Sequence, residues 1–222
     1  MSRITTILII TAVMLFNLSS GAQAEDWNMW GKDAGHTFFT TDSVEPPLKV
    51  SWIFDLGNPS SVGSTSLYVP VSPVISNNTI YANGITVDDK DIQWWHFAID
   101  ADNGKLLWKY KAQDNLARIA AISDLTIVND AMNVYAISNG AEKWRKEIIG
   151  KNSNPLIIYR NQVFLNEVYA LSPENGSLLW KYEPELPNGD DNHLENNYFS
   201  PLVAGEDKVI LAMESIRKKR MG

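Results

Sequence analysis

The sequence predicts an all-β fold built from repeated four-stranded antiparallel units, and three observations support this prediction. A glycine recurs every 36 residues, at Gly104, Gly140 and Gly176, and a tryptophan follows each glycine by four positions. Short segments rich in β-branched and aromatic residues separate these turns, and prolines lie at their starts. No window beyond the N-terminal segment keeps the 3.6-residue period of an amphipathic helix.

Each repeat contains a hairpin that leads into a strand with a tryptophan. The turns read Asn-Gly, which is typical of hairpins because both residues tolerate positive φ. The strands before the turns are expected at Phe97–Asp100, Tyr135–Ser138 and Tyr169–Ser172. The tryptophans after them are Trp108, Trp144 and Trp180. Their constant place after the turn predicts that they pack between repeats. The middle copy has a turn two residues shorter than the others.

Two further strands are expected before each hairpin, which gives four strands per repeat. They are Val71–Ile75 and Thr79–Asn83, then Ile119–Ser123 and Leu125–Val128, then Pro155–Tyr159 and Gln162–Asn166. A fourth unit begins with Tyr198–Ala204 and Lys208–Met213, after which the pattern stops. A repeated four-stranded meander is the blade of a β-propeller, whereas a β-sandwich, the alternative, gives no reason for a constant interval. We therefore predict about three and a half propeller blades in an incomplete ring.

The blade pattern resembles that of PQQ-like, quinoprotein-type propeller repeats. Tyr169–Trp180 reads Tyr-Ala-Leu-x-x-x-x-Gly-x-x-x-Trp, and Phe97–Trp108 is as close to the motif. The resemblance covers about Lys49–Met213, and WD40 or kelch patterns fit less well. It implies that Pro47–Phe54 is a lone tryptophan strand that completes the last blade of a ring. Because that blade is missing, the sequence is expected to be a truncated copy.

The N-terminus is expected to be a cleaved secretory signal. Arg3 precedes the apolar run Ile4–Phe16, which is shorter than a membrane span, and Ala22-Gln23-Ala24 fits a cleavage site. The expected organisation is a signal peptide at 1–24, a lead segment at 25–48, propeller repeats at 49–214 and an off-pattern tail at 215–222. The start of the lead segment, Asp26–Trp30, also resembles exported members of the family. We expect export to the periplasm, the cell surface or the medium, with no membrane span left after cleavage.

Composition narrows the classes of partner. The chain has 222 residues, a net charge of −7 and no cysteine. Without cysteine, neither disulfides nor a lipid-modified cysteine anchor can form. The acidic balance argues against nucleic acid as a partner, since the only basic run is Arg217–Arg220. A protein or a glycan is the expected kind of partner.

No residue is assigned as catalytic or metal-binding, and the cofactor-binding residues are unknown. Only one of Trp94 and Trp95 can face the core, because adjacent strand residues point to opposite sides, and a loop at Val87–Ile92 is expected to cover the other. Asp100–Gly104 resembles the start of a calcium loop, but lysines stand where an EF-hand has its glycine and glutamate. The oxygen-rich loop 188–197 is interpreted as a solvated insertion, and calcium binding there stays open.

The sequence favours a non-catalytic function. His36, His96 and His193 lack the spacing of zinc ligands, and there is no nucleophile elbow. No cofactor is expected: many quinoprotein dehydrogenases use adjacent cysteines, which this chain lacks, and no position matches their calcium ligands. The leading hypothesis is an exported binding or scaffolding module for protein or glycan. The alternatives are a fragment of a PQQ-dependent alcohol or sugar dehydrogenase and a truncated copy without independent function.

Overall fold

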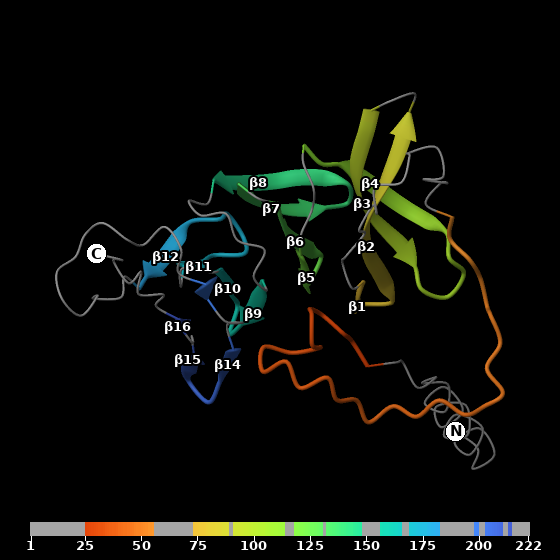
Figure 1. Ribbon diagram of the computed structural model, residues 1–222, viewed down its shortest axis with the longest axis horizontal. Helices are drawn as coiled ribbons and strands as arrows, with labels where there is room; N and C mark the ends of the chain where they lie inside the picture. The colour runs from red at the N-terminus through yellow and green to blue at the C-terminus, as the bar shows by residue number, and fades with distance from the viewer. Residues whose placement is uncertain are drawn as a thin grey trace, which may run out of the picture. The chain divides into compact units, whose positions relative to one another are not determined.

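A computed structural model describes ten stretches of the chain (Figure 1). They are residues 25–55, 73–88, 91–113, 118–130, 132–147, 156–165, 169–182, 198–199, 203–210 and 213–214. The predicted signal peptide at 1–24, the acidic loop at 188–197 and the tail at 215–222 lie outside them. The chain divides into two compact units, and all strands belong to the larger one, Asp26–Phe39 with Glu45–Gly222. The described stretches contain no helix long and apolar enough to cross a membrane.

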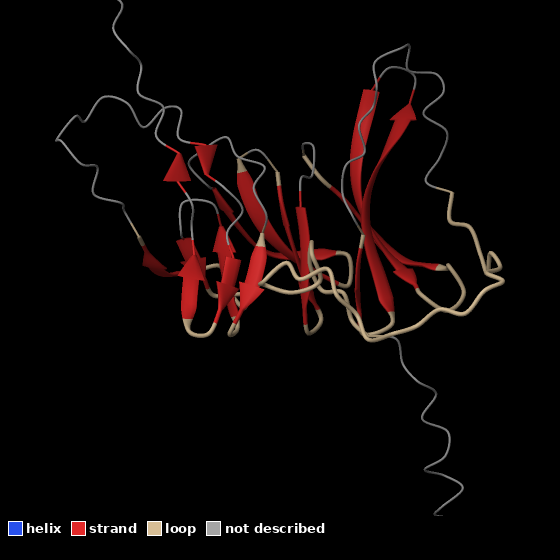
Figure 2. Ribbon diagram, turned by 60° about the horizontal axis from the view of Figure 1, so that its bottom comes forward, coloured by secondary structure: helices blue, strands red, loops and turns tan. Residues whose placement is uncertain are grey.

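Three four-stranded antiparallel sheets follow one another along the chain, each a meander in sequence order. Figure 2 shows the strands in red and the loops that join them in tan. Blade 1 consists of β1 (Val74–Ser76), β2 (Thr79–Asp88), β3 (Asp91–Asp100) and β4 (Leu106–Lys111). Blade 2 consists of β5 (Arg118–Ile122), β6 (Leu125–Asn129), β7 (Asn133–Ser138) and β8 (Ala141–Glu147). Blade 3 consists of β9 (Ile157–Tyr159), β10 (Gln162–Leu165), β11 (Tyr169–Leu171) and β12 (Leu178–Lys181).

A fourth blade is present in part. Its strands are β13 (Tyr198–Phe199), β14 (Val203–Gly205), β15 (Lys208–Ile210) and β16 (Met213–Glu214). β14 pairs with β15 and β13 pairs with β16, so the four short pieces form the first two strands of a blade. The predicted all-β fold of three blades and a partial fourth is confirmed.

The first blade differs from the prediction at one hairpin. Strands β2 and β3 are ten residues each and pair along their whole length, with Val87 opposite Ile92 and Asp88 opposite Asp91. The prediction of a loop over Val87–Ile92 is therefore wrong. The repeat pattern ends the second strand at Asn83, but the β-branched residues Ile85 to Val87 continue the ladder beyond it.

The Asn-Gly turns take two different forms. The two-residue turn between β7 and β8 has positive φ at both Asn139 (51°) and Gly140 (74°). The longer turns after β3 and β11 have positive φ only at the glycine. There the asparagine acts through its side chain, because Asn103 Oδ1 accepts a hydrogen bond from the backbone N–H of Lys105, 2.9 Å away. Asn175 Oδ1 likewise accepts a hydrogen bond from the backbone N–H of Ser177. The asparagine side chains therefore stabilise the longer turns.

The sheets pack face to face through two hydrophobic clusters. Ile119 and Val128 of blade 2 belong to a cluster with Val74 of blade 1, whereas their neighbours Ala120 and Ile127 belong to a second cluster with residues of blade 3. This alternation is the two-residue period of a strand that is buried on both faces. Blade 2 is thus a central layer whose two sides are both covered by neighbouring blades.

Each repeat glycine lies against a tryptophan that comes from earlier in the chain. A Cβ atom added to Gly104 would lie 2.6 Å from the ring of Trp52. Gly140 has the same relation to Trp108, where the added Cβ would lie 3.2 Å from the tryptophan Cβ. We call each of these pairs a tryptophan–glycine contact. The third pair is Trp144 with Gly176, where the nearest distance would again be 2.6 Å.

Hydrogen bonds of the indole fix two of these contacts. Trp52 Nε1 donates to the carbonyl of Ala101 at 2.9 Å, and Trp144 Nε1 donates to that of Pro173 at 2.7 Å. Both carbonyls lie three residues before the glycine. The prediction of tryptophans between blades is confirmed for Trp108 and Trp144, but Trp180 is 39% exposed. Among the described residues no glycine turn follows blade 3 to cover it.

The lead segment runs along the first strands of the blades. The backbone of Trp27 exchanges two hydrogen bonds with Ile75 of β1, at 2.8 and 2.9 Å. Further along, the carbonyl of Asn28 accepts from the N–H of Ala121 in β5, and the carbonyl of Ala34 accepts from that of Ala204 in β14. A segment outside the repeats thereby joins the inner strands of three blades.

Candidate functional site

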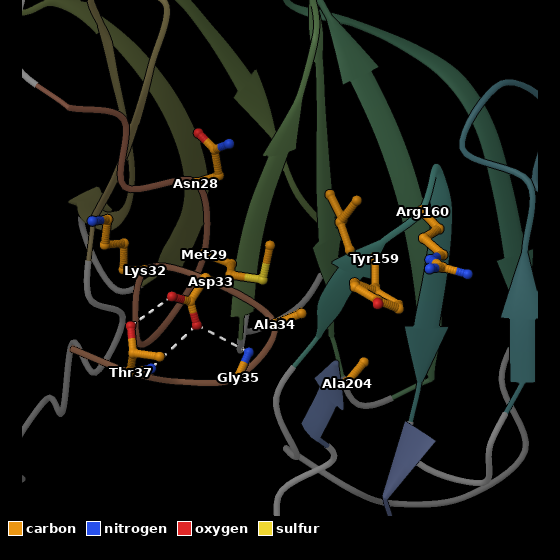
Figure 3. A pocket seen from close by; sticks show the side chains of 11 residues that line it. Asn28, Met29, Lys32, Asp33, Ala34, Gly35, Thr37, Tyr159, Arg160 and Ala204 are labelled. Atoms are coloured by element: carbon orange, nitrogen blue, oxygen red, sulfur yellow. Dashed lines mark hydrogen bonds between the residues drawn. The ribbon is translucent and has the colours of Figure 1, made fainter. Parts of the chain in front are cut away.

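A pocket of about 380 Å³ lies between the lead segment and blade 3 (Figure 3). The lead segment contributes Lys32, Asp33 and Thr37, and blade 3 contributes Tyr159 and Arg160. Smaller parts of the wall come from Asn28, Met29, Ala34, Gly35, Ile158 and Ala204. Nothing in the sequence pattern pointed to this pocket, because one wall lies outside the repeats.

The lead-segment wall is a tight loop closed around a glycine. Gly31 has a φ of 79°, and a Cβ on it would lie 2.7 Å from the Cα of His36. His36 Nδ1 lies 2.8 Å from the carbonyl oxygen of Trp30. Because a carbonyl only accepts, Nδ1 is the protonated nitrogen of this imidazole. The backbone approach at Gly31 therefore sets the shape of this wall.

Asp33 holds the same loop from within. Its carboxylate accepts hydrogen bonds from the backbone N–H groups of Gly35 (3.0 Å) and Thr37 (3.2 Å) and from the Thr37 hydroxyl (2.5 Å). Burial raises the pKa of Asp33, but these hydrogen bonds, with the nearby charge of Lys32, outweigh burial and bring the pKa below its ordinary value. The carboxylate is charged at neutral pH, and it accepts its hydrogen bonds from groups of the same loop.

Replacing Asp33 by asparagine is expected to lower the free energy of unfolding at pH 7 by about 1 kcal/mol, because an amide accepts these hydrogen bonds more weakly. The lowered pKa means that the carboxylate stabilises the fold above its ordinary pKa of 3.8, and that this contribution is lost as pH falls through the folded-state value. Urea unfolding at pH 7 and at pH 2 measures both effects. A difference between parent and variant that is as large at pH 2 as at pH 7 would contradict this role.

The blade 3 wall is an aromatic ring with a cation over it. The Arg160 guanidinium lies 5.5 Å from the centroid of the Tyr159 ring and forms an ion pair with Asp207 of blade 4. The backbone N–H of Asp207 also donates to the Tyr159 hydroxyl at 3.4 Å. Both charged side chains are mostly exposed, so the ion pair orients the tyrosine and the arginine more than it stabilises the fold.

The pocket presents hydrogen-bonding groups and an aromatic surface. Lys32 Nζ donates to the carbonyl of Phe39 at 2.6 Å, Asp33 holds its own loop and Arg160 is paired with Asp207. Asn28 Oδ1 is a buried acceptor without a hydrogen-bond partner in the structure. Such a set suits recognition of a ligand that carries hydroxyl or amide groups.

The tryptophan pair of blade 1 lies as the strand alternation predicts. Trp94 packs against the hydrophobic cluster between blades 1 and 2. Trp95 points to the other side, where its Nε1 donates to Thr86 Oγ1 at 2.8 Å and Lys109 Nζ lies 4.4 Å from its ring centroid. The prediction that only one of the two faces the core is confirmed.

The calcium-like sequence after β3 forms a turn. Asp100 Oδ1 accepts hydrogen bonds from the backbone N–H groups of Asp102 and Asn103, at 2.9 and 3.1 Å. The part of the chain that the structure describes has no group of three or more acidic, histidine or cysteine side chains placed to hold a metal ion. Calcium binding by the loop 188–197 remains a hypothesis, since that loop lies outside the described residues.

A buried polar cluster at the interface of blades 1 and 2 was missed by the sequence analysis. His96 is fully buried, with Nδ1 2.7 Å from Asn83 Oδ1 and Nε2 3.0 Å from Thr126 Oγ1. Burial lowers the pKa of His96 to about 3. Asn83 of β2 lies opposite His96 of β3 in the strand register. This pairing could have been predicted from the sequence if the second strand had been extended beyond Asn83.

These features define a protein of propeller blades joined by tryptophan–glycine contacts. The family described as outer membrane protein assembly factor BamB matches residues 97–217, which is more than half of the chain, and the chain belongs to this family of PQQ-like propeller repeats. The resemblance in the blade motif is thereby confirmed. No curated protein sequence matches the chain.

Solved propellers are similar to the chain in structure. Quinohemoprotein alcohol dehydrogenase from Comamonas testosteroni has 18% identity and a TM-score of 0.51, over 79% of this chain and 30% of its own. A europium-containing methanol dehydrogenase has 14% identity and a TM-score of 0.51, over 72% and 32%. BamB from Moraxella catarrhalis has 17% identity and a TM-score of 0.40, over 53% and 36%. The chain spans about a third of these structures, and identities this low show the fold alone.

Proposed function

We propose that this chain is a non-catalytic binding module of an exported protein, which engages a protein or glycan partner through the pocket between the lead segment and blade 3. The observation that supports this proposal is the use of the ionisable groups in the pocket. Asp33 is held by Thr37 and Gly35, and Arg160 is paired with Asp207. These charges shape the walls, and they leave the Tyr159 ring to a ligand.

Export is part of the same proposal. Its support is the N-terminal sequence, in which a basic residue, an apolar run and a small-x-small site follow one another. Expression of the whole chain in a bacterial host, followed by N-terminal sequencing of the product, tests it. A product that begins at Glu25 supports export, and a product that keeps residues 1–24 contradicts it.

Binding is tested with a glycan array and a library of extended 15-residue peptides applied to the exported chain. We expect a probe whose affinity falls at least tenfold in a Tyr159→Ala variant. The matched control is Lys109→Ala, which also removes the side chain of a cation–aromatic pair but lies in blade 1, and which should bind the probe like the parent. A probe that binds both variants equally would place recognition elsewhere and overturn the pocket proposal.

The alternative function, a quinone-dependent dehydrogenase, is distinguished from a binding module by cofactor binding and by substrate oxidation. A quinone-dependent dehydrogenase would bind pyrroloquinoline quinone in a fixed stoichiometry and reduce an electron-accepting dye when given an alcohol or a sugar. We expect neither, as judged by an absorbance titration and a dye-linked assay on the same preparation. Stoichiometric quinone binding with substrate-dependent dye reduction would replace the proposed function by the enzymatic one.

A further inference from the structure

We propose that Asn139 is a site of spontaneous deamidation, at which the backbone nitrogen of Gly140 attacks the side-chain amide and water completes its conversion to aspartate or isoaspartate. This inference goes beyond the proposed function, because it concerns a covalent change in the turn between β7 and β8 and not the pocket. It rests on a difference between this turn and the two other Asn-Gly turns of the repeats, which carry the same dipeptide.

The reaction needs only the chain and water. The Gly140 nitrogen gives up its proton and bonds to Cγ of Asn139, the bond from Cγ to Nδ2 breaks, and ammonia leaves with that proton. Water then opens the cyclic imide at either of its two carbonyls. One opening gives aspartate, and the other gives isoaspartate, in which the main chain runs through Cβ and Cγ. Glycine favours the ring closure, because it has no Cβ beside the attacking nitrogen.

The attacking nitrogen is held by a hydrogen bond in two of the three turns. The N–H of Gly104 donates to the carbonyl of Asp100, and that of Gly176 donates to the carbonyl of Ser172, both at 2.9 Å. Removal of the proton would break this bond and leave the carbonyl without its donor. In the part of the chain that the structure describes, the N–H of Gly140 makes no such bond, because a two-residue hairpin pairs the strand residues on either side of the turn.

The side chain under attack differs in the same way. Oδ1 of Asn103 and Oδ1 of Asn175 each accept from a backbone N–H at 2.9 Å, so both carboxamides are held in one orientation. Ring closure requires the carboxamide to rotate until Cγ faces the glycine nitrogen. Asn139 is exposed, and its side chain makes no hydrogen bond within the described stretches. Its carboxamide can therefore reach the reactive orientation without losing a contact.

Two further Asn-Gly pairs lie outside the repeat turns. Asn83 is 6% exposed, lies within the paired part of β2 and has its Oδ1 2.7 Å from His96 Nδ1, so it is shielded from water and held. Asn188 and Gly189 lie outside the described residues. The expected order of reaction therefore concerns the three repeat turns, and Asn139 is first among them.

The isoaspartate product alters the packing of blade 2 on blade 1. It adds a methylene to the main chain directly before Gly140, and a Cβ on Gly140 would lie 3.2 Å from that of Trp108. The turn has two residues, both at positive φ, so it contains no further residue that could absorb the added length. Aspartate keeps the normal backbone length and tolerates positive φ. Only the isoaspartate form is therefore expected to weaken the hairpin.

The test is peptide mapping of the full chain after incubation at pH 8, with the same chain in concentrated guanidinium chloride as the unfolded control. The tryptic peptides 91–105, 119–143 and 161–181 each contain one of the three sites, and fragment masses locate the new carboxylate. In the folded chain Asn139 should react at least about tenfold faster than Asn103 and Asn175, which must each lose two hydrogen bonds first. In the unfolded chain the three rates should agree within about threefold. Equal rates in the folded chain, or the same ranking in both states, would overturn the proposal.

Two variants test the consequence for the hairpin. Asn139→Gly accepts positive φ and has no amide to react, and Asn139→Asp carries the product's charge on a backbone of normal length. An isoaspartyl methyltransferase, which labels isoaspartate and not aspartate, identifies the aged product. Aged parent protein should unfold at a lower urea concentration than fresh Asn139→Asp, whereas Asn139→Gly should unfold alike before and after ageing. Parent protein that carries isoaspartate at position 139 and unfolds like Asn139→Asp would contradict the effect on the hairpin.

Discussion

Replacing Gly176 by alanine is expected to lower the free energy of unfolding by about 3 kcal/mol. The glycine has a φ of 68°, a conformation that costs a residue with a Cβ about 1 to 2 kcal/mol. The new Cβ would also lie 2.6 Å from Trp144 Cε3, so the indole must shift. Trp144 is 9% exposed, and its indole N–H is hydrogen-bonded to the carbonyl of Pro173. A shift of the indole therefore disturbs packing on both sides of the interface between blades 2 and 3, which adds about 1 to 3 kcal/mol to the loss of stability.

Two other glycines serve as controls in the same urea-unfolding experiment. Gly205 has no atom within 4 Å of its would-be Cβ and no positive φ, so Gly205→Ala should change stability by less than about 0.5 kcal/mol. Gly140→Ala should fall between the two, because its φ is 74° but its nearest contact is the longer 3.2 Å to Trp108. Equal losses at Gly176 and Gly205 would show that the tryptophan–glycine contact contributes little to stability.

The repeat could be predicted from the sequence because its residues recur at a constant interval. The residue that each repeat glycine contacts in the folded protein could not be predicted in this way. In the sequence Gly176 is close to Trp180, four positions away, whereas in the structure it lies against Trp144 of the preceding blade. A strict period makes both spacings recur, four residues from Gly176 to Trp180 and 32 residues back to Trp144, so it cannot distinguish these two pairings. The choice is made by face-to-face packing, which joins segments far apart in the chain.

The pocket was not predictable for a related reason. The loop that forms one wall depends on Asp33, whose three hydrogen bonds stay within four residues, and its position depends on backbone pairing with β1, β5 and β14. Neither feature repeats, so a search for periodicity passes over both. Local turn chemistry around Gly31 and Asp33 would have indicated a tight loop, but it contains no information on which blade the loop reaches.

The polar cluster around His96 places one titratable side chain inside the interface of blades 1 and 2. The imidazole packs against the Tyr81 and Trp108 rings, with centroids 6.1 and 5.5 Å away, and is fully buried. Thr126 Oγ1 also lies 3.2 Å from the carbonyl of Ile137, so the cluster extends into the backbone of blade 2. A proton added to this imidazole would place a charge in a desolvated interface, which is why burial lowers the pKa.

The stability of the protein is accordingly expected to fall as the pH is lowered from about 6.5 toward 3. In the unfolded chain His96 binds a proton near its ordinary pKa of 6.5, whereas in the folded chain it does so only near pH 3. Between these values the unfolded state binds more protons, so this residue costs about 1.4 kcal/mol of unfolding free energy for each pH unit of acidification. At pH 4 the loss is about 3 kcal/mol relative to pH 6.5 and above.

The comparison that isolates this contribution is His96→Gln, which keeps a side chain able to hydrogen-bond to Asn83 and Thr126 but removes the titration. The variant should be less stable than the parent at pH 7, because the amide cannot fill the imidazole site, and its stability should depend less on pH by about 1.4 kcal/mol per unit between pH 6.5 and 4. Urea unfolding across this range gives the slope, and the His96 ring resonances should show no titration above pH 4. An unchanged slope in the variant would mean that acid sensitivity comes from other groups, and the buried imidazole would then be a packing residue alone.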